Sequence, residues 1–175
     1  IEDLIPEETC IFTLTHEGYI KRTTLDTYQA QNRGGRGVQG MTQKDEDFTE
    51  EMYVGSTHDY MLFLTNQGRV YRLKGYQVPE GSRTAKGSHI VNLLQLQEGE
   101  SVTLMLQQKA DVDEDNTYAT MITKQGLIKR TPLSQFRNIR KAGLIAIALN
   151  EGDSLVWSHL TKGDDEIIVA THDGA

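Results

Sequence analysis

A short pattern that recurs four times along the chain constrains its fold more than any other sequence feature. Each copy is a β-rich apolar run followed by a Thr, two polar residues and a Gly, and in the first three copies a second β-rich run ending in Arg follows. The copies lie at 10–22, 60–72, 118–130 and 166–174. Since such runs suit strands and Gly accepts a positive φ in a turn, each copy predicts a β-hairpin.

A Gly-bearing basic loop recurs with the hairpins, because its Gly follows the hairpin Gly after 17 to 19 residues. The loops are 31–37, 82–88 and 138–143, and further β-like runs follow them. About four short strands in each unit of about 50 residues are typical of a propeller blade. We therefore expect an all-β, β-propeller-like repeat of four-stranded units. A plain all-β sandwich or barrel with accidental similarity is the alternative.

The repeats divide the 175 residues into three complete units and the start of a fourth. The expected units are 9–57, 58–115, 116–163 and 164–175, within a single domain fragment (1–175). Because the chain does not begin with Met, we expect it to be a piece of a longer protein. Three blades do not readily close a ring, and open sheet edges favour pairing with another chain. Self-association of the fragment is therefore predicted.

The other motifs in the sequence offer no catalytic or metal site. A lone Cys10 excludes an internal disulfide and a Cys-based zinc site, and no apolar run has the length of a membrane helix. Residues 81–88 superficially resemble a phosphate-binding P-loop but carry Lys and Gly in the wrong order. The acidic run 111–116 lacks the Gly and the bidentate Glu of a calcium loop, since Asn116 and Ile122 occupy those positions. We predict no catalytic residue and no metal.

The net charge of −7 hides a partition of charge along the chain. The segments from hairpin Gly to loop Gly, 18–37, 68–87 and 126–143, hold fourteen of the 18 Lys and Arg residues but only Asp26 and Glu80 among the acids. Equivalent segments of successive blades would form a curved basic rim, which suits the phosphate backbone of duplex DNA. Outside the loop 31–37, the predicted rim contacts are Lys21, Arg22, Arg69, Arg72, Lys74, Arg83, Lys86, Lys129, Arg130, Arg137, Arg140 and Lys141.

The first basic loop resembles the gyrase A box, Q-R-R-G-G-(K/R)-G, of the C-terminal domain of DNA gyrase A subunits. Its residues are Gln31, Asn32, Arg33, Gly34, Gly35, Arg36 and Gly37, and six of the seven match, with Asn32 in place of Arg. The resemblance implies a β-pinwheel, a six-bladed disc of which this chain would form about three and a fraction blades. It also implies DNA binding by the box and wrapping of double-stranded DNA around the rim, mainly independent of sequence.

The same resemblance implies the functional setting. The partners would be the remainder of the gyrase A subunit, together with the gyrase B subunit, in an A2B2 enzyme of the bacterial cytoplasm and nucleoid. Other domains would bind ATP and Mg²⁺ and break DNA, so this fragment would need no cofactor, and ATP-driven strand passage would introduce negative supercoils. Two alternatives remain: the C-terminal domain of a topoisomerase IV A subunit, and a propeller acting as a protein-interaction scaffold.

Overall fold

The computed structural model describes residues 2–25 and 48–163, and strands dominate these ranges. The strands are β1 (Thr9–Thr15), β2 (Tyr19–Thr24), β3 (Thr49–Ser56), β4 (Tyr60–Thr65), β5 (Arg69–Lys74), β6 (Ser88–His89), β7 (Val102–Gln108), β8 (Thr117–Thr123), β9 (Ile128–Pro132), β10 (Leu144–Ile145) and β11 (Leu155–Lys162). Short 3-10 helices are η1 (Glu2–Leu4), η3 (Gly75–Gln77), η4 (Ile90–Asn92) and η5 (Leu133–Phe136). The all-β prediction is confirmed.

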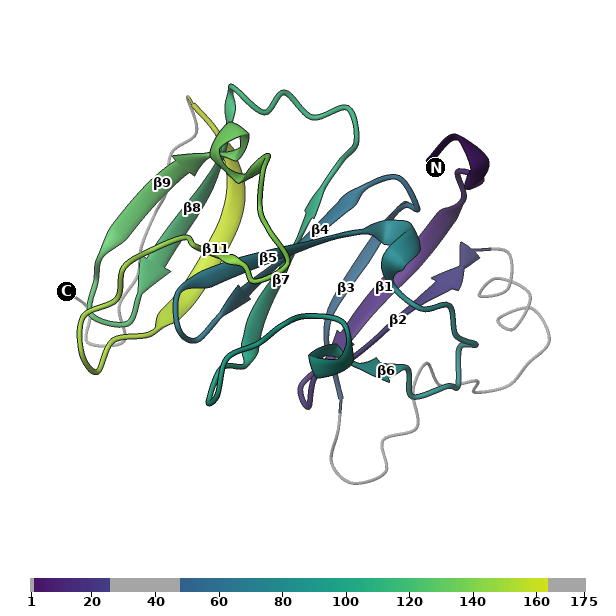
Figure 1. Cartoon of the computed structure of the whole chain (residues 1–175), viewed down its shortest axis with the longest axis horizontal. Coiled ribbons are helices and arrows are strands. Elements are labelled where there is room, and N and C mark those ends of the chain that lie inside the picture. The colour runs from purple at the N-terminus through teal and green to yellow at the C-terminus, as the bar shows by residue number, and fades with distance from the viewer. Residues whose placement is uncertain (1, 26–47, 164–175) are drawn as a thin grey trace.

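The strands form three antiparallel sheets, each built around one of the predicted hairpins. Their strand orders are β3-β1-β2-β6, β10-β5-β4-β7 and β11-β8-β9, and Figure 1 shows them side by side in chain order. Gly18, Gly68 and Gly126 occupy the hairpin turns with φ of 94°, 76° and 92°. Because L-residues with a side chain rarely adopt this conformation, the recurring Gly is explained. The predicted fourth hairpin at 166–174 lies outside the described residues.

The sheets do not coincide with the sequence repeats, because two of them take a strand from the following unit. Strand β6 belongs to the second unit by sequence but pairs with β2 of the first, and β10 of the third unit pairs with β5 of the second. Each of these two sheets therefore combines three strands of its own unit with a two-residue strand that follows the next basic loop. This exchange joins neighbouring units through main-chain hydrogen bonds.

The core consists of two apolar clusters, one on each side of the middle sheet. Met61 and Phe63 of β4 lie in the cluster shared with the first sheet, whereas Leu62 and Leu64 lie in the cluster shared with the third. Strand β4 is therefore buried on both faces, which explains its continuous apolar run. Burial of each such side chain contributes about 1.5–3 kcal/mol. Among the described residues, no helix is long and apolar enough to cross a membrane.

Candidate nucleic-acid interface

The predicted rim cations fall into three groups when they are sorted by burial. Lys86, Lys129, Arg130, Arg137, Arg140 and Lys141 are exposed; Arg22, Arg69, Arg72 and Lys74 are half-buried; Lys21 and Arg83 are buried. The box residues 31–37 lie outside the described residues. Only the first group presents its charge fully to solvent, so the exposed cations come from the second and third units.

Lys21 is 3% exposed, and its ammonium is enclosed by the second basic loop. Its Nζ donates to the carbonyl oxygens of Ser82, Arg83 and Ala85 at 2.9, 2.6 and 2.9 Å. Burial, together with the nearby Arg83 charge, lowers the pKa of the Lys21 ammonium to about 8. The prediction that Lys21 and Arg83 lie on an exposed rim is therefore wrong, because the second basic loop covers Lys21 and its own Arg83 is buried.

Two of the half-buried arginines link each unit to the next. Arg22 Nε donates to the Val78 carbonyl at 2.8 Å, and the Arg72 guanidinium donates to the Arg137 carbonyl at 2.7 Å. The two acceptors are equivalent, because Val78 and Arg137 each directly follow a 3-10 helix. Arg22 and Arg72 also occupy equivalent positions of their hairpins, so the repeat places the same link at both junctions between units.

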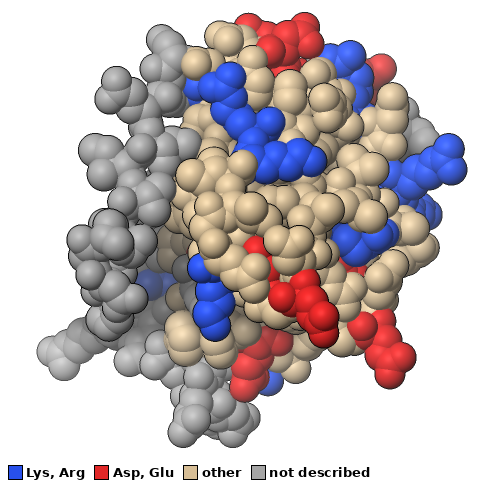
Figure 2. All heavy atoms as spheres, turned by 90° about the vertical axis from the view of Figure 1, so that its left-hand side faces the viewer, with Lys and Arg blue, Asp and Glu red and all other residues tan. Residues whose placement is uncertain are grey.

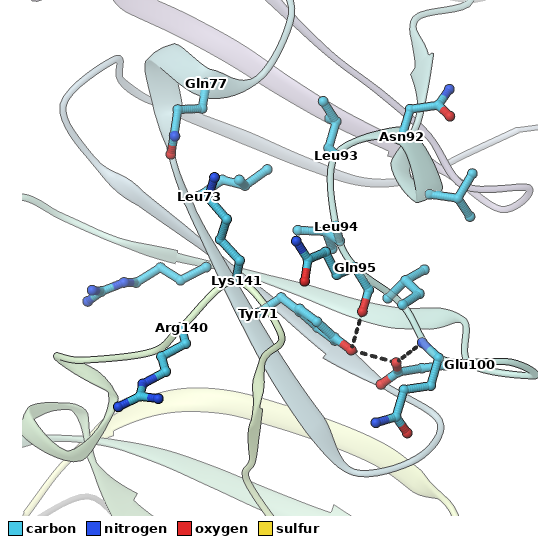
Figure 3. A pocket seen from close by; sticks show the side chains of 14 residues that line it. Tyr71, Leu73, Gln77, Asn92, Leu93, Leu94, Gln95, Glu100, Arg140 and Lys141 are labelled. Atoms are coloured by element: carbon cyan, nitrogen blue, oxygen red, sulfur yellow. Dashed lines mark hydrogen bonds between the residues drawn. The ribbon is translucent and has the colours of Figure 1, made fainter.

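Arg69 is tied to a buried acid that the sequence analysis missed. Its Nε lies 3.7 Å from Oε2 of Glu100. This carboxylate accepts a hydrogen bond from the Tyr71 hydroxyl at 2.6 Å, which Figure 3 shows, and another from the Thr65 hydroxyl at 2.7 Å. Burial raises the pKa of Glu100, but the bond from the Gln97 amide, these two hydroxyls and the Arg69 charge together hold it below its usual value. Arg69 therefore compensates the Glu100 charge.

Lys74, the last of the half-buried cations, is held by the N-terminal segment and by its own hairpin. Its Nζ lies 3.2 Å from Glu2 Oε1 and donates to the His58 carbonyl at 3.1 Å. Lys74 Nζ and the Arg72 guanidinium lie 4.0 and 4.1 Å from the centre of the Tyr60 ring. Attraction to the ring fixes both side chains. Such aromatic supports were not predicted, although Tyr60 and Tyr118 each lie eight residues before the hairpin Gly of their unit.

A hollow of about 740 Å³ gathers cations from two units. Arg72 of β5 lines it together with Arg140 and Lys141 of the third basic loop, the last two of which Figure 3 labels. Leucines, amide side chains, Tyr71, Val91 and Glu100 form the rest of the lining. Among the described residues that line it, Glu100 is the one acid, and its charge is compensated by Arg69. Within the described ranges, Arg140 and Lys141 have no acidic partner. The rim of the hollow is therefore suited to bind an anion.

The other exposed cations are supported by neighbours in different ways. Lys86 lies 4.2 Å above the Tyr19 ring and Arg130 lies 4.1 Å above the Tyr118 ring, whereas Arg137 is paired with Glu114 at 2.8 Å. Figure 2 shows the side that carries the third sheet, where cationic side chains extend across the upper half and also lie beside acids in the lower half, and further acids lie at the top edge. The cations of this surface can attract a polyanion electrostatically.

The family described as "DNA gyrase C-terminal domain, beta-propeller" matches residues 11–54, 59–108 and 118–162. The DNA gyrase A subunit of Clostridium acetobutylicum is 53% identical over 174 residues, which is 99% of this chain and 21% of that protein. The corresponding protein of Staphylococcus epidermidis is 49% identical over 97% of this chain and 19% of its own length. The chain thus spans about a fifth of these relatives.

Two solved structures share the fold of this chain. The C-terminal domain of DNA topoisomerase IV aligns with a TM-score of 0.76 and 29% identity over 91% of this chain and 48% of that chain. The DNA gyrase A C-terminal domain aligns with a TM-score of 0.65 and 26% identity over 90% and 49%. With three separate parts of the sequence matched and the fold shared, the chain belongs to the DNA gyrase C-terminal domain, beta-propeller, family.

Proposed function

We propose that this chain is the DNA-wrapping part of a gyrase A subunit, where it holds duplex DNA by its phosphates. The observation that carries the proposal is the recurrence of exposed cations at the end of the basic loop in successive units, Lys86 in the second and Arg140 with Lys141 in the third. Such contacts neutralise phosphates, release counterions and read no bases. The affinity would therefore be independent of sequence and strongly dependent on salt.

Wrapping requires that the cations follow a curved path. Bending a short duplex costs on the order of several kcal/mol, and many backbone contacts offset this cost. In this proposal, equivalent loops of successive units would repeat the same phosphate contact at regular intervals. In the proposed enzyme, the wrapped duplex would be presented to the DNA-breaking part, and ATP-driven passage would make the supercoils negative. ATP, Mg²⁺ and the gyrase B subunit would act through other domains.

The box residues 31–37 provide the first contact in this proposal. Arg33 and Arg36 would bind phosphates, and the glycines would let the main chain approach the backbone closely. Asn32 supplies a polar group in place of a charge. A topoisomerase IV A subunit is the second candidate, because the TM-score to that domain, 0.76, is higher than the 0.65 to the gyrase A domain. The box favours gyrase over this candidate. The 49–53% identity to gyrase A subunits favours gyrase as well.

Salt-titrated binding of the chain to a random-sequence duplex tests DNA binding. We expect Arg140→Ala with Lys141→Ala to weaken binding to all sequences and to lower the slope of log K against log salt by about one for each phosphate that is no longer neutralised. Lys109→Ala is the matched control, because Lys109 is an exposed cation outside the basic segments. Equal effects of both changes, or no binding at moderate salt, would favour a protein scaffold instead.

The box is tested in the complete enzyme. Arg33→Ala with Arg36→Ala should abolish supercoiling and spare relaxation and decatenation, because only supercoiling depends on the wrap. An equal loss of all three activities would contradict wrapping by the box. Wild-type enzyme that decatenates efficiently and never supercoils would identify the topoisomerase IV candidate.

A further inference from the structure

The third basic loop is shorter than the second, and the hollow described above lies beside it. The hairpin Gly and the loop Gly are 17 residues apart in the third unit and 19 residues apart in the second. The longer loop folds around the Lys21 ammonium of β2. The equivalent residue of β5 is Tyr71, and its ring and the shorter loop both line the hollow of about 740 Å³. A hollow of this size can hold a small organic molecule.

One wall of the hollow is apolar. Leu73, Leu93 and Leu96 line it, and each is partly buried against the core cluster that the first two sheets share. Because the core holds these side chains in place, the wall exists before any ligand binds. A ligand that covers the remaining surface of the three leucines gains free energy roughly in proportion to the apolar area that it removes from water.

Hydrogen bonds fix the chain segment that follows this wall. The Gln97 amide donates to Oε1 of Glu100 at 2.8 Å, and the Tyr71 hydroxyl lies 3.2 Å from the Gln95 carbonyl oxygen (Figure 3). The Glu100 side chain is 0% exposed and is paired with Arg69. The one acid among the described lining residues therefore does not present its charge to a ligand in the hollow.

The third basic loop brings a cation to the hollow. Figure 3 shows the Lys141 side chain extending from this loop toward Leu73. The loop is held beside Lys141, because the guanidinium of Arg69 donates to the carbonyl of Ala142. Within the described ranges Lys141 has no acidic partner. Its ammonium is therefore free to pair with an anion that enters the hollow.

We propose that this hollow binds a small organic anion, whose charged group pairs with Lys141 and whose apolar body lies on Leu73, Leu93 and Leu96. A bare phosphate would pair with the ammonium and leave the leucines uncovered, whereas an uncharged ring would cover the leucines and leave the ammonium unpaired. A ligand that carries both groups satisfies both sides of the hollow. Side-chain amides in the lining add hydrogen-bond donors and acceptors.

A ligand in this hollow would compete with DNA for Lys141, and this consequence rests on the proposed function. The Lys141 ammonium cannot pair with the ligand and with a phosphate of the duplex in the same position. An occupied hollow would therefore weaken the hold of the third unit on DNA. The site itself does not depend on DNA binding, and its first test contains no DNA.

Equilibrium dialysis of this chain with 1-naphthyl phosphate tests the site. We expect this probe to bind about tenfold or more tightly than inorganic phosphate, which lacks the apolar body. It should also bind about tenfold or more tightly than 1-naphthol, which lacks the charge. Equal affinities for the three molecules, or no binding of naphthyl phosphate, would overturn the proposal.

Two pairs of variants locate the bound probe. Lys141→Ala should weaken naphthyl phosphate about tenfold, whereas Lys109→Ala, which removes an exposed cation outside the lining, should not. Leu93→Ser should weaken naphthyl phosphate and leave inorganic phosphate unchanged, whereas Leu4→Ser, at an 86% exposed leucine outside the lining, should change neither. Lys141 is exposed, so its replacement keeps the fold even if that of Leu93 does not. Equal effects of the two lysine variants would overturn the proposal.

A competition experiment separates this site from the proposed function. At matched ionic strength, saturating naphthyl phosphate should weaken the binding of a random-sequence duplex to the wild-type chain and should not affect its binding to Lys141→Ala. Probe binding by a chain that does not bind DNA would refute the proposed function and still support the site. A duplex affinity that the probe leaves unchanged in the wild-type chain would overturn the pairing of the ligand with Lys141.

Discussion

Strands β2 and β9 carry the same four residues, Ile-Lys-Arg-Thr, in opposite environments. On β2, the segment 78–89 of the second unit covers Ile20 and encloses the Lys21 ammonium, and we call this contact the first joint. On β9, Ile128 and Lys129 are exposed. The comparison teaches that in a repeat protein the neighbouring unit decides whether a cation stabilises the fold or faces solvent.

The largest expected effect on the free energy of unfolding comes from replacing two glycines with alanine, one in the first joint and one in the third hairpin. Gly87 of the first joint and Gly126 of the third hairpin have φ of 93° and 92°, but only at Gly87 would a Cβ meet the Ile20 backbone. Gly126→Ala should lower the free energy of unfolding by about 1 kcal/mol through backbone strain alone. Gly87→Ala should lower it by about 2–4 kcal/mol, because overpacking adds to that strain.

Urea denaturation of the two variants measures this difference directly. Since residue type and φ are matched, the excess loss for Gly87→Ala reports the contact between the loop and β2. Equal losses would show that the second unit does not pack closely on β2, and the first joint would then have no special status.

The next effect concerns the two equivalent lysines. Lys21→Met should lower the free energy of unfolding by about 1–3 kcal/mol, because the carbonyls of Ser82, Arg83 and Ala85 lose their donor. Lys129→Met should change it by less than about 0.5 kcal/mol, since Lys129 is exposed. Thermal denaturation of both variants at neutral pH is the measurement, and a larger loss for Lys129→Met would reverse the assignment of the two environments.

The lowered pKa of Lys21 predicts that the stability of the chain depends on pH. The folded-state pKa is about 8 against 10.5 for the free side chain, so between these values the unfolded chain binds more protons at this site. The contribution of Lys21 to stability is therefore full above pH 10.5 and is lost as the pH falls through 8. The difference in melting temperature between wild type and Lys21→Met should shift in favour of wild type from pH 8 to 10.5. A constant difference across this window would contradict the lowered pKa.

The smallest effect tests the aromatic supports. Tyr60→Leu removes the ring under both Arg72 and Lys74 and should destabilise the chain by about 1 kcal/mol. Tyr118→Leu removes the ring under Arg130 alone and should destabilise it by about 0.5 kcal/mol. Urea midpoints of the two variants can be compared directly. A larger loss for Tyr118→Leu than for Tyr60→Leu would contradict this ranking.

The hairpins were predictable because their signal is local. Apolar runs and a turn Gly at a fixed offset define β4 and β5 without any tertiary information, and the repeat supports them three times. The exchanged strands were not predictable, since Ser88–His89 and Leu144–Ile145 are two residues long and leave no periodic pattern. Their pairing is set by the neighbouring unit, which a pass along the chain does not reveal.

The candidate site was predictable in composition but not in burial. Counting Lys and Arg in the basic segments identified the exposed Arg140 and Lys141, but it also included the buried Lys21 and Arg83. Sequence shows which residues carry charge, whereas a carbonyl cage such as that of Lys21 depends on residues some 60 positions away. The available signal was the comparison of repeats: the position of Lys21 is occupied in the second repeat by Tyr71, which is buried.

The most direct test of the account is the amine reactivity of individual lysines in this chain, measured by mass spectrometry with and without a random-sequence duplex at moderate salt. We predict that Lys21 is unreactive in both conditions, because the first joint covers it. Lys86 and Lys141 should react in the free chain and become protected by DNA, while the exposed Lys109 reacts equally in both. Reaction of Lys21 as fast as Lys141, or equal protection of Lys109 and Lys141 by DNA, would contradict the division between joint cations and DNA-binding cations.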